Sequence, residues 1–218
     1  MAEGDKLRVI VLGFPGVGKG TISKHIEHEY GLHHISTGDI FREKTKENSL
    51  LGKQIKELID KGNFVPDEIT TKIVLERIEK DDCANGYILD GFPRTLKQAE
   101  DFHKKESVEI VMLLDADEKK IIDRLSGRLT CPKGHVYHIR NVIPKKKGIC
   151  DKDGEKLIRR ADEDPKIVKQ RMVNYDKQTK PLLDFYQKKH KELIHHVDAN
   201  KEINELFKEV DEILEFFV

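Results

Sequence analysis

The stretch GFPGVGKGT, residues 13–21, constrains the fold of this chain more than any other feature. It follows an apolar run typical of a strand and precedes a stretch with Ile22 and Ile26 at helical spacing, which Gly31 ends. Glycines in such a turn let several backbone N–H groups point at phosphate oxygens, and the N-terminal end of the helix favours negative charge. The stretch therefore predicts a phosphate-binding loop in which Lys19 contacts the terminal phosphates.

The loop departs from the usual pattern at one position. Ser or Thr normally follows the lysine and supplies a hydroxyl for magnesium, whereas this chain has Gly20 there and Thr21 one residue later. A glycine-rich turn without any ligand is the alternative. We favour the phosphate-binding loop because it stands between a predicted strand and a predicted helix, and because Thr21 still offers a hydroxyl in the first helical turn.

Composition excludes several classes of function. The 218 residues suffice for one domain with sizeable insertions, and the 40 basic and 40 acidic residues balance to a net charge of zero. No overall field would therefore attract nucleic acid or an anionic membrane. The first residues lack the pattern of a secretory signal, no apolar run reaches bilayer length, and the three cysteines argue against a disulfide framework. We expect a cytoplasmic protein, with Cys83 as a small core residue.

Apolar runs alternate with helical stretches along the chain. The runs are residues 7–12, 33–36, 87–90, 109–115 and 193–199. This alternation predicts an α/β fold in which helices cover both faces of a parallel sheet. A long polar helix is expected over 168–189, kinked or divided by Pro181, with Met172, Tyr175, Leu182 and Tyr186 as candidate buried positions. The last helix, 202–218, should pack on the sheet with Ile203, Leu206, Phe207, Val210, Ile213 and Leu214.

Two segments interrupt the alternation. Residues 37–65 are helical and charge-rich, and they are too many for a simple connection between neighbouring strands. Residues 127–164 are interrupted by Gly, Pro, Lys and Cys residues and contain the hairpin-like stretch HVYHIR. We interpret both as insertions, the second with a small fold of its own.

The loop, written GxPGxGKGT, resembles that of the adenylate kinases and related nucleoside monophosphate kinases. Further stretches match the same family in order: STGD followed by Arg42, DGFPRTLKQAE, GRL opening an insert that contains VYH, and RRADE followed by Arg171. The resemblance covers nearly the whole chain. It implies a three-layer P-loop fold with a five-stranded parallel sheet, in one domain over 1–218. That domain would comprise a core (1–36, 66–126, 165–218), a helical NMP-binding insert (37–65) and a small β-rich lid (127–164).

The resemblance also implies the reaction, a reversible Mg²⁺-dependent transfer of the terminal phosphoryl group of ATP to AMP that gives two ADP. Such a transfer brings two polyanions together, so the protein must supply positive charge from several directions. Arginine suits this task because its fixed fork holds two phosphate oxygens and keeps its charge. Any single arginine would more often be a surface salt bridge. Six arginines stand together at strand ends and in the inserts, and this joint placement favours phosphate binding over surface salt bridges. They are Arg42, Arg94, Arg124, Arg128, Arg160 and Arg171.

The family assigns the remaining site residues by position. The catalytic set would be Lys19, Asp90, Arg94, Arg128, Arg160 and Arg171. The ATP site would comprise Gly16, Val17, Gly18, Lys19, Gly20, Thr21, Arg124, Arg128, Val136, Tyr137 and Lys201. The AMP site would comprise Thr37, Arg42, Asn63, Phe64, Val65, Gly91, Phe92, Pro93, Arg94, Gln98, Arg160 and Arg171. Ala199 stands where the family often has Gly, which leaves the donor-base contact there open.

Two of these assignments have simpler alternatives. Asp90 closes a predicted strand beside the phosphate loop, where a carboxylate can hold magnesium through water, but it could also only cap the strand. Ser36 and Thr37 could only cap the helix that follows them. No general base is expected, because the acceptor phosphate is already nucleophilic and positioning with electrostatics can carry the rate.

The second insert contains a possible zinc site. Cys131, His135, Cys150 and Asp153 resemble the zinc ligands of some long-lid members of the family. The usual second ligand falls on Gly134, and His135 or His138 would have to replace it. We therefore favour a lid held by hydrogen bonds and apolar contacts, with zinc as the alternative, and we assign no protein metal ligands.

Two other functions compete with the ATP:AMP reaction. A related kinase could take GTP as donor or a pyrimidine monophosphate as acceptor, although RTLKQA favours AMP and the long lid disfavours the pyrimidine kinases. A nucleotide-driven switch would read guanine with N-K-x-D, and the nearest stretch, NKEI at Asn200, lacks the aspartate. We expect small-molecule partners only, namely ATP, AMP and ADP, and a monomer. The interpretation requires Lys19 and Arg94 to share one cavity.

Overall fold

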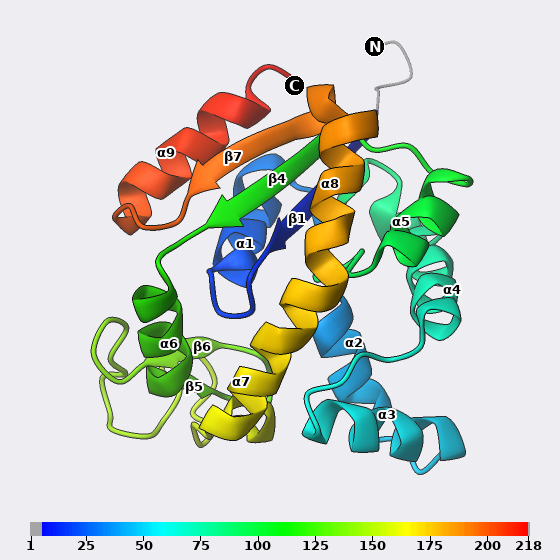
Figure 1. Cartoon of the computed structure of the whole chain (residues 1–218). Coiled ribbons are helices and arrows are strands. Elements are labelled where there is room, and N and C mark those ends of the chain that lie inside the picture. Colours follow the sequence, from blue (N-terminus) through cyan, green and yellow to red (C-terminus); the bar gives the residue numbers. More distant parts are fainter. Residues whose placement is uncertain (1–5, 218) are drawn as a thin grey trace.

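This computed structural model describes residues 6–217 and is organised around a five-stranded parallel sheet (Figure 1). The strands lie in the order β2-β3-β1-β4-β7. Their bounds are β1 (Leu7–Gly13), β2 (His33–Ser36), β3 (Gly86–Asp90), β4 (Ile110–Asp115) and β7 (Ile194–Asp198). The predicted fold class is confirmed, and each predicted run ends within one residue of its strand.

The central strands β1 and β4 are mostly apolar because both faces of the sheet are covered there. Val9 and Val11 of β1 pack on one face with helices α1 (Lys19–Tyr30) and α9 (Ile203–Leu214). Ile10 and Leu12 point to the other face and pack with α4 (Asp67–Ile78), α5 (Leu96–His103) and α8 (Lys180–Lys189). This alternation follows from the two-residue period of a strand and makes the three layers.

The phosphate loop follows β1, at the place where the chain segments leaving β1 and β3 turn to opposite faces of the sheet. The chain leaves β1 into α1 on one face of the sheet and leaves β3 into α5 on the other face. Neighbouring parallel strands whose connections depart in opposite directions leave a crevice at their carboxyl ends. The residues after β1 and after β3 therefore face one crevice.

Both predicted inserts project from this end of the sheet (Figure 1). The first contains α2 (Thr37–Lys44) and α3 (Leu50–Asp60), with Phe41, Ile55 and Val65 in a small core. The second follows α6 (Glu118–Gly127) and contains an antiparallel pair, β5 (Arg128–Thr130) and β6 (Val136–His138). Of the hairpin-like stretch HVYHIR, residues 136–138 form β6 and pair with β5, which precedes that stretch.

The long helix predicted over 168–189 is interrupted before Pro181. It consists of α7 (Pro165–Asn174), a π-helical turn (Tyr175–Thr179) and α8, with Pro181 in the first turn of α8. Proline has no N–H to donate to the preceding turn, and a wider turn accommodates this loss. Tyr175, Leu182 and Tyr186 are buried as predicted, whereas Met172 is only partly buried.

The last helix is shorter than predicted. α9 begins at Ile203 and ends at Leu214, while Val218 and residues 1–5 lie outside the described residues. Leu206, Val210 and Leu214 are buried on the sheet as expected, but Ile203 is 44% exposed because it stands at the first position of the helix. Short 3₁₀ turns complete the chain at Asp81–Cys83, Ala161–Glu163 and Lys191–Leu193.

Between residues 6 and 217 the chain has no helix with the length and apolar character that crossing a bilayer requires.

A histidine at the end of α5 makes stability depend on pH. His103 stacks on His190 with ring centroids 4.7 Å apart, and its Nε2 lies 3.1 Å from the hydroxyl of Tyr186. Burial lowers the pKa of His103 to about 4, and the neighbouring His190 adds to this effect. The folded protein therefore keeps this ring neutral while the unfolded chain binds a proton from about pH 6.5 downward.

Stability is consequently expected to fall as the pH drops from about 6.5 to 4, over the interval in which only the unfolded chain is protonated at this position. Urea unfolding at pH 7 and pH 5 measures the loss. The His103→Gln variant, which cannot be protonated, should lose less stability over the same interval. An equal loss in both proteins would contradict this origin.

Candidate active site

The phosphate loop adopts the conformation that its glycines allow. Gly16 has a φ of +88°, and a Cβ atom there would lie 2.5 Å from Cγ of Leu125. Gly18 caps α1 in a left-handed conformation with a φ of +119°. Lys19 Nζ donates to the carbonyl oxygens of Gly13 and Phe14, at 2.9 Å each. The lysine thus folds back over the loop, with the N-terminus of α1 beside it.

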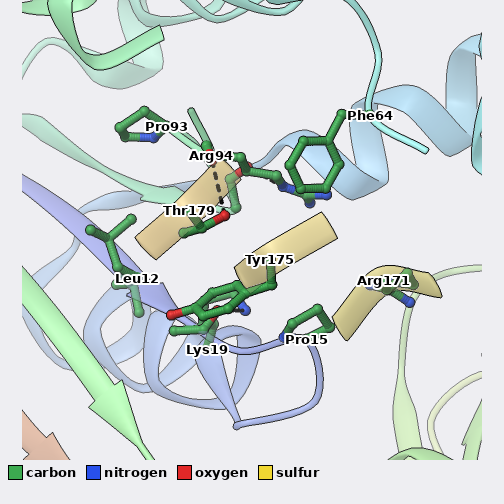
Figure 2. Close-up of a pocket in the computed structure, with 12 residues that line it drawn as sticks. Leu12, Pro15, Lys19, Phe64, Pro93, Arg94, Arg171, Tyr175 and Thr179 are labelled. Atoms are coloured by element: carbon green, nitrogen blue, oxygen red, sulfur yellow. Dashed lines mark hydrogen bonds between the residues drawn. The ribbon is translucent and has the colours of Figure 1, made fainter. Parts of the chain in front are cut away.

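Lys19 and Arg94 line the same partly open cavity (Figure 2). The loop after β1 contributes Gly13 and Pro15, and the turn after β3 contributes Gly91 and Pro93. The remaining lining side chains are Val11, Leu12, Phe64, Arg171, Tyr175 and Thr179. The requirement set by the sequence is met, since the two cations approach one space from two strand ends.

Arg94 is held in place by neighbours on both sides. Its Nε donates to the carbonyl oxygen of Gly91 at 2.7 Å, and its guanidinium lies over the ring of Phe64, 5.4 Å from the centroid. Its backbone N–H donates to Oε1 of Gln98 at 2.7 Å. Burial lowers the pKa of Arg94 to about 10, and the charge of Arg171 adds to this effect. Arg94 remains charged at neutral pH.

Arg171 also lines the cavity, and the predicted Arg128 and Arg160 extend this group of cations into the second insert. Arg171 donates to Asp162 at 2.9 Å, and Arg160 donates to the hydroxyl of Thr130 at 3.2 Å. Arg128 pairs with Glu163, whose Oε2 is buried and finds no hydrogen-bond partner among residues 6–217. Burial lowers the pKa of Arg160 to about 10, and the charges of Arg42 and Arg128 contribute. These cations come close enough to repel one another.

The neighbouring arginines also affect the pKa of Lys19 in the phosphate loop. Burial lowers the pKa of Lys19 to about 7; Asp90 opposes this effect, and the charges of Arg94, Arg171 and Arg128 reinforce it. A cluster whose cations outnumber the acidic partners Asp90, Asp162 and Glu163 is stabilised when an anion enters. The arrangement is therefore suited to polyphosphate.

Asp90 lies at the carboxyl end of β3, next to the start of α1. A Cβ atom at Gly20 would lie 3.4 Å from its Oδ2. Although burial opposes ionisation, a hydrogen bond from His34 and the charge of Lys19 hold the pKa of Asp90 below its usual range. An ionised carboxylate beside a phosphate loop is a hard oxygen ligand, and the site therefore fits Mg²⁺. Thr21 is exposed in the first turn of α1.

The acceptor-side residues are only partly brought together. Thr37 is buried and donates to the carbonyl oxygen of Gly91 at 2.8 Å, so it joins the first insert to the turn after β3. Ser36, not Thr37, caps α2 by accepting from Asp39 N–H. Gln98 Nε2 donates to Asp67 at 2.8 Å. Arg42 pairs with Asp39 and Asn63 is exposed, while Phe92 and Val65 are buried in apolar clusters and do not line the cavity.

The predicted donor-side residues are more scattered. Arg124 donates to the carbonyl oxygens of Val17 at 2.7 Å and Ala199 at 2.8 Å, so it joins the phosphate loop to the loop after β7. Lys201 pairs with Glu209 of α9 at 3.2 Å. The side chain of Val136 is 46% exposed, and Tyr137 is buried inside the second insert.

Several residues of this region were missed by the sequence analysis. Tyr175 was expected only as a core position, yet it lines the cavity and packs on Phe14 of the loop at 4.0 Å between centroids. Thr179 donates to the carbonyl oxygen of Arg94 at 2.9 Å, and His34 reaches Asp90. The periodicity of a helix or strand could mark such positions as buried, but it carried no signal for contact with the loop or with Asp90.

The second insert contains a compact group of metal-ligand side chains. Ligand atoms of Cys131, His135, Cys150 and Asp153 all lie within 4.8 Å of one another. Nδ1 of His135 lies 2.9 Å from Asp153, 3.3 Å from Cys131 and 3.4 Å from Cys150. His138, the other candidate, instead hydrogen-bonds to the carbonyl of Asp123 and accepts from backbone N–H groups with Nδ1. His135 is therefore the histidine of this group.

Comparison with known proteins agrees with this geometry. The family model described as adenylate kinase matches residues 11–191. The adenylate kinase of Oceanobacillus iheyensis is 46% identical over 215 residues, which cover 96% of this chain and 99% of that protein. Adenylate kinases of Caldanaerobacter subterraneus subsp. tengcongensis and Clostridium perfringens strain SM101 are 44% and 43% identical over 214 residues. Those matches cover 95% of this chain, and 96% and 98% of the relatives.

The family model covers more than half of the chain, and these relatives cover nearly all of it at high identity. This continuous match agrees with the cavity that Lys19 and Arg94 share, and it shows that the chain belongs to the adenylate kinase family.

Proposed function

We propose that this chain transfers the terminal phosphoryl group of ATP to AMP with the residues around the cavity between the phosphate loop and Arg94, giving two ADP. The observation that carries the proposal is that Lys19 and Arg94 line one cavity from two different strand ends. The phosphate loop receives the donor phosphates, and the turn after β3 receives the acceptor phosphate. The two polyanions then meet between the cations.

The chemistry depends on charge and position. Lys19 leaves the carbonyl oxygens of the loop and contacts the transferred phosphate, while Arg94 orients the acceptor phosphate. Arg128, Arg160 and Arg171 add charge from the second insert and α7, and they stabilise the negative charge that spreads over the moving group. The attacking phosphate oxygen is already ionised, so no residue has to remove a proton.

Adenylate kinases use ATP together with Mg²⁺, and Asp90 is the residue that fits this ion here. Asp90 would hold the ion through its water molecules, with Thr21 as a further oxygen near the loop. Bound Mg²⁺ neutralises charge on the donor phosphates. Every other contribution comes from the chain itself, which binds, orients and screens the two nucleotides.

The choice of nucleotides is tested by a coupled assay of ADP formation. ATP with AMP should support turnover that requires both substrates, and replacing AMP by UMP or CMP should abolish most of it. Replacing ATP by GTP distinguishes the related GTP:AMP kinase. Slow hydrolysis of ATP without consumption of AMP would contradict the proposal and favour a nucleotide-driven switch.

We also propose that the chain works as three parts, with a core of residues 1–36, 66–126 and 165–218. The NMP-binding insert (37–65) and the lid (127–164) each have their own small apolar cluster. Two such parts can close over bound nucleotides and exclude water, which would otherwise take the phosphoryl group. The cytoplasmic location and the monomeric state remain predictions.

The lid cluster is proposed to bind Zn²⁺ through Cys131, His135, Cys150 and Asp153. Two thiolates, an imidazole and a carboxylate are ligands that tetrahedral zinc prefers. The apolar cluster around them is small, with Tyr137 and Leu157 beside the two cysteines, so a metal would contribute much of the lid's stability. The sequence analysis favoured a lid without zinc, because Gly134 stands at the usual position of the second ligand. We now prefer zinc, because the side chain of His135 lies where that ligand is expected.

Purified protein is expected to carry about one zinc per chain, measured by atomic emission after dialysis. The Cys131→Ser variant should lose the metal, whereas Cys83→Ala, which removes the cysteine outside the cluster, should retain it. Protease cleavage within 127–164 should increase in Cys131→Ser and in chelator-treated protein. A two-substrate analogue should reduce cleavage in the wild type. Zinc-free protein with a protease-resistant lid would contradict the metal proposal alone.

A further inference from the structure

His34 and Asp90 form a nearly buried pair at the edge of the active site that the reaction scheme does not use. Their side chains are 8% and 14% exposed, and Nε2 of His34 lies 3.3 Å from Oδ2 of Asp90. His34 pairs with Ile88 across β2 and β3, and Asp90 is two residues beyond Ile88. Residues two apart on a strand share a face, so the two side chains meet diagonally on the same side of the sheet.

The direction of this hydrogen bond follows from the charge of Asp90. An ionised carboxylate can only accept, so Nε2 of His34 must carry the proton and donate it. Within residues 6–217 no other side chain donates a hydrogen bond to this carboxylate. Without His34, the carboxylate would rotate freely between orientations that the strand end allows.

The same oxygen that accepts from His34 also lies against the phosphate loop. Oδ2 of Asp90 is 3.4 Å from the place a Cβ atom would take at Gly20, where α1 begins. A Cβ atom at Gly20 would thus be in ordinary contact with this oxygen, which places the carboxylate directly beside the start of α1. His34 holds the carboxylate from one side while the start of α1 confines it from the other.

We propose that His34 is a positioning residue that fixes the Asp90 carboxylate beside the phosphate loop for the hydrated Mg²⁺ of bound ATP. The inference rests on the proposed role of Asp90. Side chains that orient a metal-facing carboxylate typically change metal affinity or activity by 10-fold to 100-fold when removed. His34 acts through Asp90 and touches neither nucleotide nor reacting atoms.

The matched pair His34→Met and His34→Gln tests the proposal, because the two side chains are similar in size and only glutamine keeps an N–H donor. His34→Met should raise the Mg²⁺ concentration at half-maximal rate about 10-fold. By calorimetry it should weaken ATP binding in the presence of Mg²⁺, while AMP binding and ATP binding in EDTA stay unchanged. His34→Gln should restore both values towards those of the wild type.

Three results would overturn the inference. They are an unchanged Mg²⁺ dependence in His34→Met, an equal defect in His34→Gln, or a parallel loss of AMP binding and melting temperature that marks a purely structural role. His34→Leu replaces the methionine variant if that variant does not fold. Asp90→Asn separates the two levels of the proposal. If Asp90→Asn leaves the Mg²⁺ dependence intact, the role proposed for Asp90 is wrong. If Asp90→Asn changes that dependence and His34→Met does not, only the role proposed for His34 is wrong.

Discussion

Replacing Arg94 with methionine is expected to lower kcat by about 10³-fold to 10⁵-fold, the range observed when a charge-stabilising arginine is lost in phosphoryl transfer. Arg94 is the cation on the acceptor side of the cavity, and Gly91 and Phe64 hold its guanidinium in place. A lysine at this position keeps a charge but not the two-pronged contact. Arg94→Lys should therefore recover only part of the rate.

The measurement is the steady-state rate of ADP formation at saturating ATP and AMP. Arg159→Met is the matched control, because Arg159 is exposed and should be replaceable with little effect. Thermal unfolding of Arg94→Met should be close to that of the wild type, since the lost side chain carries an uncompensated charge. A variant that folds and keeps more than a tenth of the rate would contradict the role assigned to Arg94.

Replacing Lys19 with methionine is expected to lower kcat by about 10³-fold, the upper range for removing one preorganised cationic or hydrogen-bonding group. Methionine fills a similar volume, so the loop should keep its shape while losing the charge that contacts the transferred phosphate. The loss should appear mainly in kcat, because backbone N–H groups of the loop still bind the donor phosphates.

Lys72→Met provides the matched control, since Lys72 lies on α4 with a side chain that is 76% exposed. Calorimetry with ATP distinguishes binding from chemistry. A Lys19→Met protein with normal turnover would show that the transferred phosphate is stabilised elsewhere. A Lys19→Met protein that no longer binds ATP would show that Lys19 acts in substrate binding and not mainly in stabilising the transition state.

The sheet and the phosphate loop could be predicted because their signals are local. Largely apolar central strands, a glycine-rich turn and a helix with Ile22 and Ile26 each occupy a short stretch of chain. The physical reasons lie in backbone conformation and in burial on both faces of the sheet. Helix ends were less predictable, as α9 shows, because a terminal position such as Ile203 obeys the periodicity without reaching the core.

The group of Cys131, His135, Cys150 and Asp153 shows what spacing along the chain does not reveal. Gly134 stands at the expected ligand position, which argued against a metal. In the structure, Gly134 N–H donates to the carbonyl of Cys131 at 3.0 Å, and its φ of +83° turns the chain back so that His135 reaches Cys131. A tight turn can thus replace one ligand position by the next. Residue spacing alone does not contain this information.

The sequence by itself determined the layers of the fold, the family and the identity of the cationic residues, because each is encoded in residue types and short-range order. Only the tertiary structure decided which side chains meet. It brought Lys19 and Arg94 to one cavity, set His34 against Asp90, and paired Lys201 with Glu209 of α9. These contacts depend on strand order and on the faces from which helices depart, and both arise when the whole chain packs.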